Sequence, residues 1–345
     1  MMKLITNTIK GLALAAALLV PAASMAADKV TVGVTNAASD IALFIADAKG
    51  YFADEDLAVE FVSFDSAAKM IAPLGAGQLD VGGGAASAGF YNGLDRNVDV
   101  RIVADKARNS PGYGFQSFLV RKALKDEGEV KSLADLKGRK VAVVSNGSSD
   151  LSVLNEALKS AGLKYDDVEV VYLGFTQQLA AYENGAIDAS ITTEPNVTNI
   201  VSKGAADVLV SNDTFYPDQQ TAVIFYGSEM LKSDSDRGLR FMKAYVRAAN
   251  FYVDALAEGG LKGKNGAEVI DIMAKYSNVK DKAVIEKMTP HRMNPDGTVN
   301  TESLQKDLDF FKQAGLVTTN ATLDGVIDAS FVAKANEALA AEGKK

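Results

Sequence analysis

The sequence predicts an α/β protein of two lobes, with a mostly parallel sheet flanked by helices in each lobe. Short apolar runs typical of strands alternate with helical runs from residue 28 to residue 226. That alternation is typical of sheets with crossover helices. A charged stretch at 122–131 interrupts the series, and a fresh series follows it. The length of 345 residues agrees with two domains.

The elements of the first series follow from the pattern within each run. Val30, Val32 and Val34 alternate with other residues, which is the period of a strand. Gly50 ends the first helix, and Pro73 is expected to break a helix that Ser66 caps. We expect strands at 30–34, 59–64, 79–82, 98–103 and 115–120, and helices at 41–49 and 87–94.

The second series begins with a short helix that Ser132 and Asp135 start with the spacing of a capping box and that Gly138 ends. Gly162 and Gly185 stop two further helices. We expect strands at 141–144, 168–172, 189–192, 208–210 and 222–226, and helices at 150–161, 177–184 and 196–202. The tail is expected to be almost entirely helical, from 237–257 on to 330–341.

Two such lobes fit a chain that crosses between them twice, and we place the crossings near 119–121 and 222–225. The first lobe then comprises 27–120 and 223–345, and the second comprises 121–222. Two lobes in series with a single crossing are the alternative, and the pattern of elements alone does not separate the two arrangements.

The first 26 residues are expected to be a signal peptide rather than part of the fold. Lys3 and Lys10 precede or flank the short apolar run 11–20, and small residues surround a cleavage site after Ala26. The run is about half of the ~20 residues that a transmembrane helix needs, so an uncleaved anchor is the less favoured alternative. With no cysteine there is no site for a lipid anchor. We therefore expect a soluble protein of the periplasm.

Composition excludes several classes of function. The absence of cysteine excludes thiol nucleophiles and Cys-ligated metal sites. The net charge of −8 becomes −10 when the predicted signal peptide is removed, which disfavours nucleic-acid binding. The single histidine, His291, is expected to be structural, and no GxSxG, HExxH or EF-hand spacing occurs. We expect a monomer that is not an enzyme and holds neither cofactor nor metal.

Three polar or glycine-rich turns follow predicted strands and precede predicted helices. In doubly wound sheets ligands bind beyond the carboxyl ends of the strands, where helix N-termini supply free N–H groups. The alternative is that these residues only cap their helices. The triple glycine is not GxGxxG, so nucleotide binding is disfavoured. The candidate ligand-binding residues in these turns are Asn36, Ser39, Asp40, Gly84, Ala85, Ser87, Asn146, Gly147, Ser148 and Ser149.

Two further candidates lie outside these turns. Glu194 follows an apolar strand and precedes Pro195, so its carboxylate is expected to accept hydrogen bonds from a ligand. It could equally complement the dipole of the next helix. Tyr113 precedes the first predicted crossing, where it could stack on a ligand or belong to the core.

The chain resembles the nitrate/sulfonate/taurine-type substrate-binding proteins of ABC importers, a group that includes binders of thiamine-precursor pyrimidines. The matching stretches cover essentially all of the chain after the signal peptide, and the most specific are LADLKG at 133–138 and GAIDA at 185–189. The resemblance implies the two-lobed fold of type II periplasmic binding proteins, in which the chain crosses twice between the lobes. It also implies ligand contacts at 36–40, 84–87, 147–149 and Glu194. An enzyme-like branch depends on a cysteine-rich motif, which this chain lacks.

The expected function is therefore that of the periplasmic component of an ABC importer. It would bind a small organic anion, such as a sulfonate, a taurine-like compound or a carboxylate, close around it and dock on the permease in the inner membrane. A substituted pyrimidine or aromatic ligand is the alternative within this class. A secreted enzyme, a binder that signals to a receptor and a tripartite-type transporter receptor are the alternatives from other classes.

Overall fold

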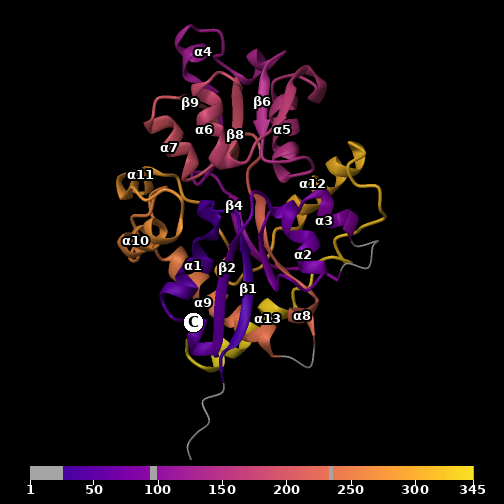
Figure 1. The fold of residues 1–345 in the computed structure, drawn as a ribbon, viewed down its shortest axis with the longest axis vertical. Helices are drawn as coiled ribbons and strands as arrows, with labels where there is room; N and C mark the ends of the chain where they lie inside the picture. The colour runs from indigo at the N-terminus through magenta and orange to yellow at the C-terminus, as the bar shows by residue number, and fades with distance from the viewer. Residues whose placement is uncertain (1–25, 94–98, 233–235, 345) are drawn as a thin grey trace, which may run out of the picture.

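The computed structural model describes residues 26–93, 99–232 and 236–344 of the chain. Two five-stranded sheets lie one above the other, each with its own helices (Figure 1). Residues 1–25 of the predicted signal peptide lie outside the described residues, so that peptide stays a prediction. Within the described part of the chain, no helix combines the length and the apolar character that crossing a membrane requires.

The first sheet has the strand order β2-β1-β3-β10-β4. β1 pairs in parallel with β2 and β3, whereas β10 runs antiparallel between β3 and β4. Val30, Val32 and Val34 are buried, as their alternation predicts. The strands are β1 (Asp28–Val34), β2 (Leu57–Ser63), β3 (Val81–Gly84), β4 (Arg101–Asn109) and β10 (Gln219–Tyr226).

The second sheet repeats this plan with the order β7-β6-β8-β5-β9. β6 pairs in parallel with β7 and β8, and β5 runs antiparallel between β8 and β9. In each sheet one strand of five is therefore reversed, and the prediction of mostly parallel sheets is confirmed. The strands are β5 (Gln116–Arg121), β6 (Lys140–Val143), β7 (Glu169–Tyr172), β8 (Ala189–Thr193) and β9 (Ala206–Ser211).

The chain passes between the sheets at 110–115, from β4 to β5, and at 212–218, from β9 to β10. The predicted crossings at 119–121 and 222–225 instead lie inside β5 and β10. An apolar run shows that a strand forms but does not show which sheet the strand joins, so the prediction was displaced by several residues. Because β10 returns to the first sheet, the single-crossing alternative is excluded. The domain boundaries given above stay a prediction.

Helices cover both sheets. Ser66 precedes a 3-10 turn over Ala67–Met70, and α2 begins only at Ile71, so Pro73 lies in its first turn, where its missing N–H costs nothing. The helices beside the sheets are α1 (Ile41–Ala48), α2 (Ile71–Gly75) and α3 (Ala88–Gly93) in the first lobe, and α4 (Lys122–Asp126), α5 (Ser149–Ser160), α6 (Phe175–Glu183) and α7 (Asn196–Ser202) in the second.

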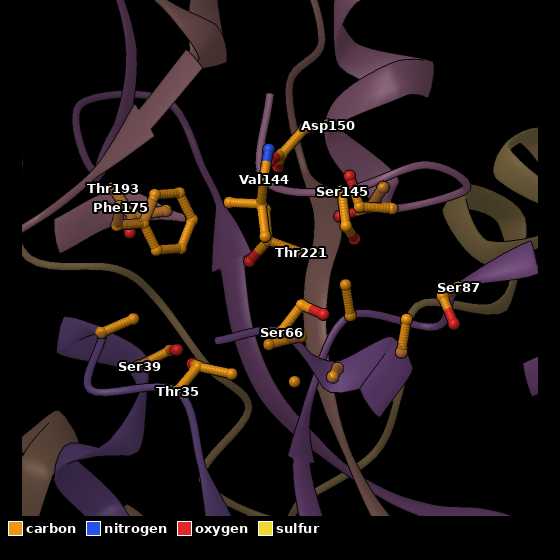
Figure 2. A pocket seen from close by; sticks show the side chains of 18 of the residues that line it. Thr35, Ser39, Ser66, Ser87, Val144, Ser145, Asp150, Phe175, Thr193 and Thr221 are labelled. Carbon is orange, nitrogen blue, oxygen red and sulfur yellow. The ribbon is translucent and has the colours of Figure 1, made fainter. Parts of the chain in front are cut away.

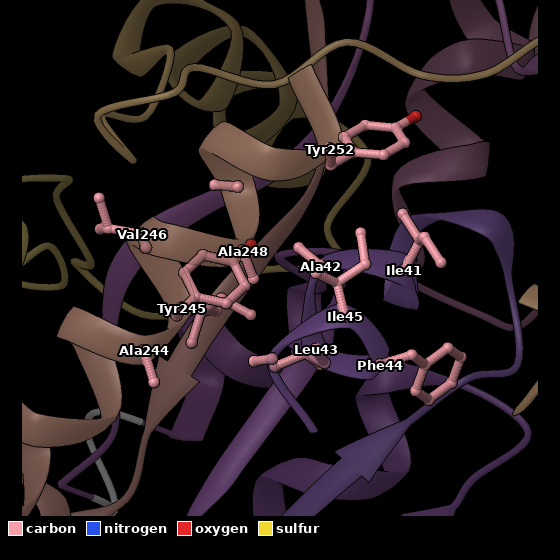
Figure 3. Packing of buried hydrophobic residues seen from close by; sticks show 14 of the residues in the cluster. Ile41, Ala42, Leu43, Phe44, Ile45, Ala244, Tyr245, Val246, Ala248 and Tyr252 are labelled. Atoms are coloured by element: carbon pink, nitrogen blue, oxygen red, sulfur yellow. The ribbon is translucent and has the colours of Figure 1, made fainter. Parts of the chain in front are cut away.

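The described chain after β10 forms helices joined by non-helical stretches at 254–265, 288–300 and 314–329, so the expectation of an almost entirely helical tail holds only in part. This tail packs on the first lobe. α9 lies against α1 and α13, where Ile41, Ile45, Tyr245 and Tyr252 belong to one buried cluster (Figure 3). α11 and α12 also contact α7 and α5 of the second lobe, so the tail bridges the lobes. Its helices are α8 (Ser228–Leu231), α9 (Arg237–Val253), α10 (Gly266–Tyr276), α11 (Lys282–Lys287), α12 (Thr301–Gln313) and α13 (Ser330–Ala341).

Candidate functional site: a polar pocket between the lobes

A pocket lies between the two sheets, where strand ends and helix starts of both lobes meet (Figure 2). It offers about 50 Å³ to the centre of a water molecule, which is room for a few waters or a small ligand. Its walls are formed by Thr35, Ala37, Ser39, Asp65, Ser66, Ala67, Ala68, Gly84, Ala85, Ser87, Thr221 and Ala222 from the first lobe and its strand β10, and by Phe115, Gln116, Val144, Ser145, Ser148, Ser149, Asp150, Phe175 and Thr193 from the second lobe.

Four hydroxyl groups in this wall are buried and have no hydrogen-bond partner in the protein. They are the Oγ atoms of Ser66, Ser145 and Ser148 and the Oγ1 atom of Thr193. Buried polar groups in folded proteins are nearly always hydrogen-bonded, so each such group calls for an explanation. Four of them around one space indicate that the occupant of the pocket is polar.

The start of α5 adds donors to the same wall. Ser148 is the N-cap residue of this helix of 12 residues and its side chain caps no N–H group, whereas Ser149 is the first helical residue. The N–H groups in the first turn of a helix have no acceptor within the helix, and they carry its positive dipole end. Since Ser148 and Ser149 both line the pocket, an acceptor on a ligand can reach this helix end.

Ser39 supplies a donor from the first lobe. The Nζ atom of Lys106 donates to the Oγ atom of Ser39 at 3.0 Å and forms an ion pair with Oδ1 of Asp40 at 2.7 Å. Because Lys106 occupies the Ser39 oxygen as an acceptor, the Ser39 hydroxyl proton is free to point into the pocket. The side chains of Lys106 and Asp40 are fully buried, so Asp40 lies behind the wall of the pocket rather than in it.

Asp150 brings a carboxylate to the pocket from the first turn of α5. Its Oδ2 accepts a hydrogen bond from the N–H of Val144 at 3.1 Å, and its Oδ1 accepts one from Nε2 of Gln116 at 3.3 Å. Burial raises the pKa of Asp150 to about 6, although these two hydrogen bonds act to lower it. The pocket therefore has an acceptor wall as well as donor walls.

Glu194 holds the lobes together and does not line the pocket. Its carboxylate accepts hydrogen bonds from the N–H of Thr198 at 3.0 Å, from Oγ1 of Thr198 at 2.8 Å and from the N–H of Thr289 at 3.2 Å. Burial raises the pKa of Glu194 to about 7, although these hydrogen bonds act to lower it. The bond to Thr198 lies in the first turn of α7, as expected of a residue that complements the dipole of that helix.

Two backbone hydrogen bonds join the lobes directly. The N–H of Ala38 donates to the carbonyl of Glu194 at 2.7 Å, and the N–H of Ala88 donates to the carbonyl of Gly147 at 2.8 Å. Gly147 has a φ of 72°, and a Cβ atom there would lie 2.9 Å from the Cβ atom of Ala88. The glycine is therefore needed for a close approach of the two lobes.

These two bonds flank the pocket on opposite sides. Ser39 and Thr193, the neighbours of the first bonded pair, lie on one side of the pocket in Figure 2, whereas Ser87 and Ser145 lie on the other. The described conformation is thus a closed one, with the pocket between two interlobe contacts.

The triple glycine serves packing more than ligand approach. A Cβ atom at Gly82 would lie 3.0 Å from Leu74, at Gly83 2.9 Å from Lys106, and at Gly84 2.6 Å from the Cβ atom of Ala67. Of the three glycines, Gly84 alone lines the pocket.

The pocket brings together six of the twelve candidates. Asn36 lies in an adjoining hollow, Asn146 accepts a hydrogen bond from Tyr172, and the Tyr113 ring lies 5.0 Å from the guanidinium of Arg292. Asp40, Gly147 and Glu194 stand behind the walls or between the lobes, as described. Those in the pocket are Ser39, Gly84, Ala85, Ser87, Ser148 and Ser149.

Sequence reasoning missed several polar residues of the wall. Ser145 and Thr193 stand at or just after the end of a strand, the position used to find the other turns, and they could have been found by that rule. Gln116 is a polar residue in an apolar strand, which is itself a signal. The missed polar residues are Thr35, Asp65, Ser66, Gln116, Ser145, Asp150, Thr193 and Thr221.

Other chemistry is not gathered here. Within the described residues, no group of three or more His, Asp and Glu side chains is placed to hold a metal ion. His291 is buried, and burial lowers its pKa to about 3. Its Nδ1 atom lies 3.1 Å from the hydroxyl of Tyr252, and its ring packs against Phe115 at 5.3 Å. These contacts are those of a neutral histidine in a core.

Comparison with known proteins agrees with this architecture. The family model described as NMT1/THI5 like matches residues 37–255. A protein of Bacillus subtilis (strain 168), named as an aliphatic sulfonates-binding protein, is 26% identical over 310 residues, which cover 86% of this chain and 85% of that protein. The residues matched by the family model include the strands from β2 to β10 and every residue of the pocket wall except Thr35.

Solved structures share the fold at low identity. The alkanesulfonate-binding protein SsuA from Xanthomonas axonopodis pv. citri, bound to MOPS, matches with a TM-score of 0.69 and 18% identity, over 87% of this chain and 98% of that one. The desulfurization enzyme DSZB matches with a TM-score of 0.63 and 15% identity, over 90% and 99%. The same two-lobed fold thus carries both a binding protein and an enzyme.

Proposed function

Because the chain belongs to the NMT1/THI5-like family, we propose that it is the periplasmic solute-binding component of an ABC importer. It encloses one small polar organic molecule between its lobes and delivers it to a permease in the inner membrane. The observation that carries this proposal is the set of four buried, unpartnered hydroxyls on residues that line one interlobe pocket. A ligand that bonds to both lobes stabilises their closed arrangement, and closure of two lobes is a common means of ligand capture.

The proposed ligand is a small organic acid, such as a sulfonate, a taurine-like compound or a carboxylate. The dipole end of α5, the free hydroxyls and the Ser39 donor support a ligand with acceptor oxygens. The proposed contacts are the lining residues Ser39, Ser66, Ser145, Ser148, Ser149 and Thr193.

The first test is calorimetry on protein purified from the periplasm of an expression host, with sulfonates, carboxylates, nitrate and pyrimidines as ligands. Mass spectrometry of the same sample shows whether the chain is cleaved after Ala26. A hydrogen bond is worth ~1 kcal/mol, so Thr193→Val and Ser148→Ala should each weaken binding by about five- to ten-fold. Thr322→Val, at an exposed position outside the pocket, is the matched control.

The outcome also separates a binding protein from an enzyme on the same fold. A binding protein returns its ligand unchanged, whereas an enzyme yields a new product in the recovered solution. A folded protein that binds no member of the panel, or binding that Thr193→Val and Ser148→Ala leave at the level of the control, would refute the proposed site.

A further inference from the structure

The two lobes contain one aspartate each at an equivalent place. β1 and β6 are the strands that pair in parallel with two neighbours in their sheets. After β1, Oδ2 of Asp40 accepts hydrogen bonds from the N–H groups of Thr35 at 3.2 Å and Ala37 at 3.1 Å. After β6, Oδ2 of Asp150 accepts one from Val144 at 3.1 Å. Each carboxylate thus fastens the turn between its strand and the helix that follows.

The two carboxylates differ in what faces their second oxygen. Oδ1 of Asp40 has the ammonium group of Lys106 at 2.7 Å, so the protein itself supplies its counter-charge. Oδ1 of Asp150 has only the neutral amide of Gln116, at 3.3 Å. Both side chains are buried, yet Asp40 has a cationic partner within the protein, whereas Asp150 has only neutral donors and the dipole end of α5.

The orientation of the Gln116 amide is fixed from behind. Its Oε1 accepts hydrogen bonds from Nδ2 of Asn109 at 3.1 Å and from Nδ2 of Asn212 at 3.4 Å, so Nε2 is the group that faces Asp150. Asp150 is therefore held as an acceptor on both of its oxygens. This arrangement holds the Asp150 carboxylate in the wall of the pocket but gives that carboxylate no cationic partner.

The remaining wall does not compensate Asp150 either. Among the described residues that line the pocket there is no lysine, arginine or histidine. The other carboxylate of the wall, Asp65, is exposed and pairs with Lys69 outside. Asp150 is 3% exposed. A buried charge without a cationic partner is costly, and Asp150 lines the pocket between the lobes.

We infer that the ligand supplies the missing counter-charge: it carries a protonated nitrogen that meets Asp150, and Asp150 is the specificity-determining residue that selects for it. This inference rests on the proposed function and narrows its ligand class. The opposite wall offers the donor Ser39 and the unpartnered hydroxyl of Ser66 (Figure 2). The occupant is thus a small zwitterion, with acceptor oxygens toward the hydroxyls and an ammonium or amidinium group toward Asp150.

Matched ligand pairs test the inference on the unaltered protein. Calorimetry at pH 7.5 compares taurine with ethanesulfonate and isethionate, and β-alanine with propionate. Within at least one pair, the aminated member should bind at least about 30-fold more tightly, because a buried charge pair is worth 2 kcal/mol or more. Each pair keeps the acid group and changes only the nitrogen, so the comparison isolates the contact to Asp150.

Two substitutions of carboxylates assign the effect to its residue. Asp150→Asn should reduce the preference for the aminated ligand at least about ten-fold, whereas Asp271→Asn, outside the pocket and paired with Lys282, should leave it unchanged. Thermal unfolding of each variant shows that it is folded. Because the ligand pairs need no variant, the inference remains testable even where Asp150→Asn does not fold.

Three results overturn the inference. The first is a wild-type protein that binds members of the ligand pairs but binds no aminated member more tightly than its partner without nitrogen. The second is a folded Asp150→Asn variant that keeps the preference for the aminated ligand. The third is binding of nitrate, or of another compound without a protonated nitrogen, while every aminated compound fails; the proposed function then stands. If nothing in the wider panel binds to the folded protein, the proposed function is wrong as well.

Discussion

Replacing Lys106 by methionine tests the buried charge pair behind the pocket. Lys106 and Asp40 are both fully buried, and their charged atoms lie 2.7 Å apart. Methionine has a similar length, so the substitution removes the charge while it fills most of the volume. Removing one partner of a buried pair leaves the other charge uncompensated, which typically costs 3–5 kcal/mol. We therefore expect Lys106→Met to lower the free energy of unfolding by about 3–5 kcal/mol.

The loss is measurable by urea unfolding. The chain has no tryptophan and 11 tyrosines, so far-ultraviolet circular dichroism at pH 7.5 is the suitable signal. At roughly 2 °C per kcal/mol for a protein of this size, the melting temperature should fall by roughly 6–10 °C. Lys49→Met is the matched control, because Lys49 and Glu268 form a pair of similar length, 2.6 Å, at the surface. Its effect should stay within about 1 kcal/mol.

A double substitution gives the coupling between the two residues. If the charge on Asp40 causes the loss, Asp40→Asn combined with Lys106→Met should be less damaging than the sum of the single changes. A loss in Lys106→Met no larger than that in Lys49→Met would refute the reasoning. Losses that simply add would also refute it, because independent residues share no ion pair.

The remaining predictions concern pH and closure. Burial raises the pKa of Asp150 to about 6 in the folded protein, so its contribution to stability is full below the unfolded pKa near 4 and is lost as the pH rises to about 6. The stability of Asp150→Asn relative to wild type should therefore grow by about 2 kcal/mol between pH 4 and pH 7 in urea titrations; a constant difference would contradict this. Gly147→Ala forces a Cβ atom to within 2.9 Å of Ala88 and should weaken ligand binding about ten-fold in calorimetry; unchanged binding would mean that the lobes do not meet there. Glu194→Ala removes the side-chain bond to Thr289 and should shift the apo protein toward an open form, seen as a larger radius of gyration in X-ray scattering. An identical radius would contradict the role of Glu194 in holding the lobes together.

Much of the fold followed from local pattern. Val30, Val32 and Val34 predict a strand because alternation decides which side chains are buried. The sheet that a strand joins depends on contacts far along the chain, and this is why 119–121 and 222–225 were taken as crossings although they lie in β5 and β10. The family resemblance implied a chain that crosses twice, which β10 confirms.

The site was predicted less completely than the fold. The rule that ligands meet the ends of strands selected Ser39 and Ser148, which line the pocket. It gave no means to separate them from Asp40, one residue further on, which faces the buried Lys106 instead. Which of two neighbouring side chains faces a cavity depends on the turn geometry. Asp150 was not selected from the sequence, because an acidic residue in the first turn of a helix is common and does not by itself indicate a site.

The hydrogen bonds from Ala38 to Glu194 and from Ala88 to Gly147 have a consequence for unloading. Both hydrogen bonds join main-chain groups, so they are the same whichever ligand occupies the pocket. Any partner that empties the pocket must separate the same two peptide contacts whatever the cargo is. Each contributes ~1 kcal/mol. Part of the free energy needed for release is therefore the same for every ligand and is set by the protein, and only the rest depends on the contacts of the ligand.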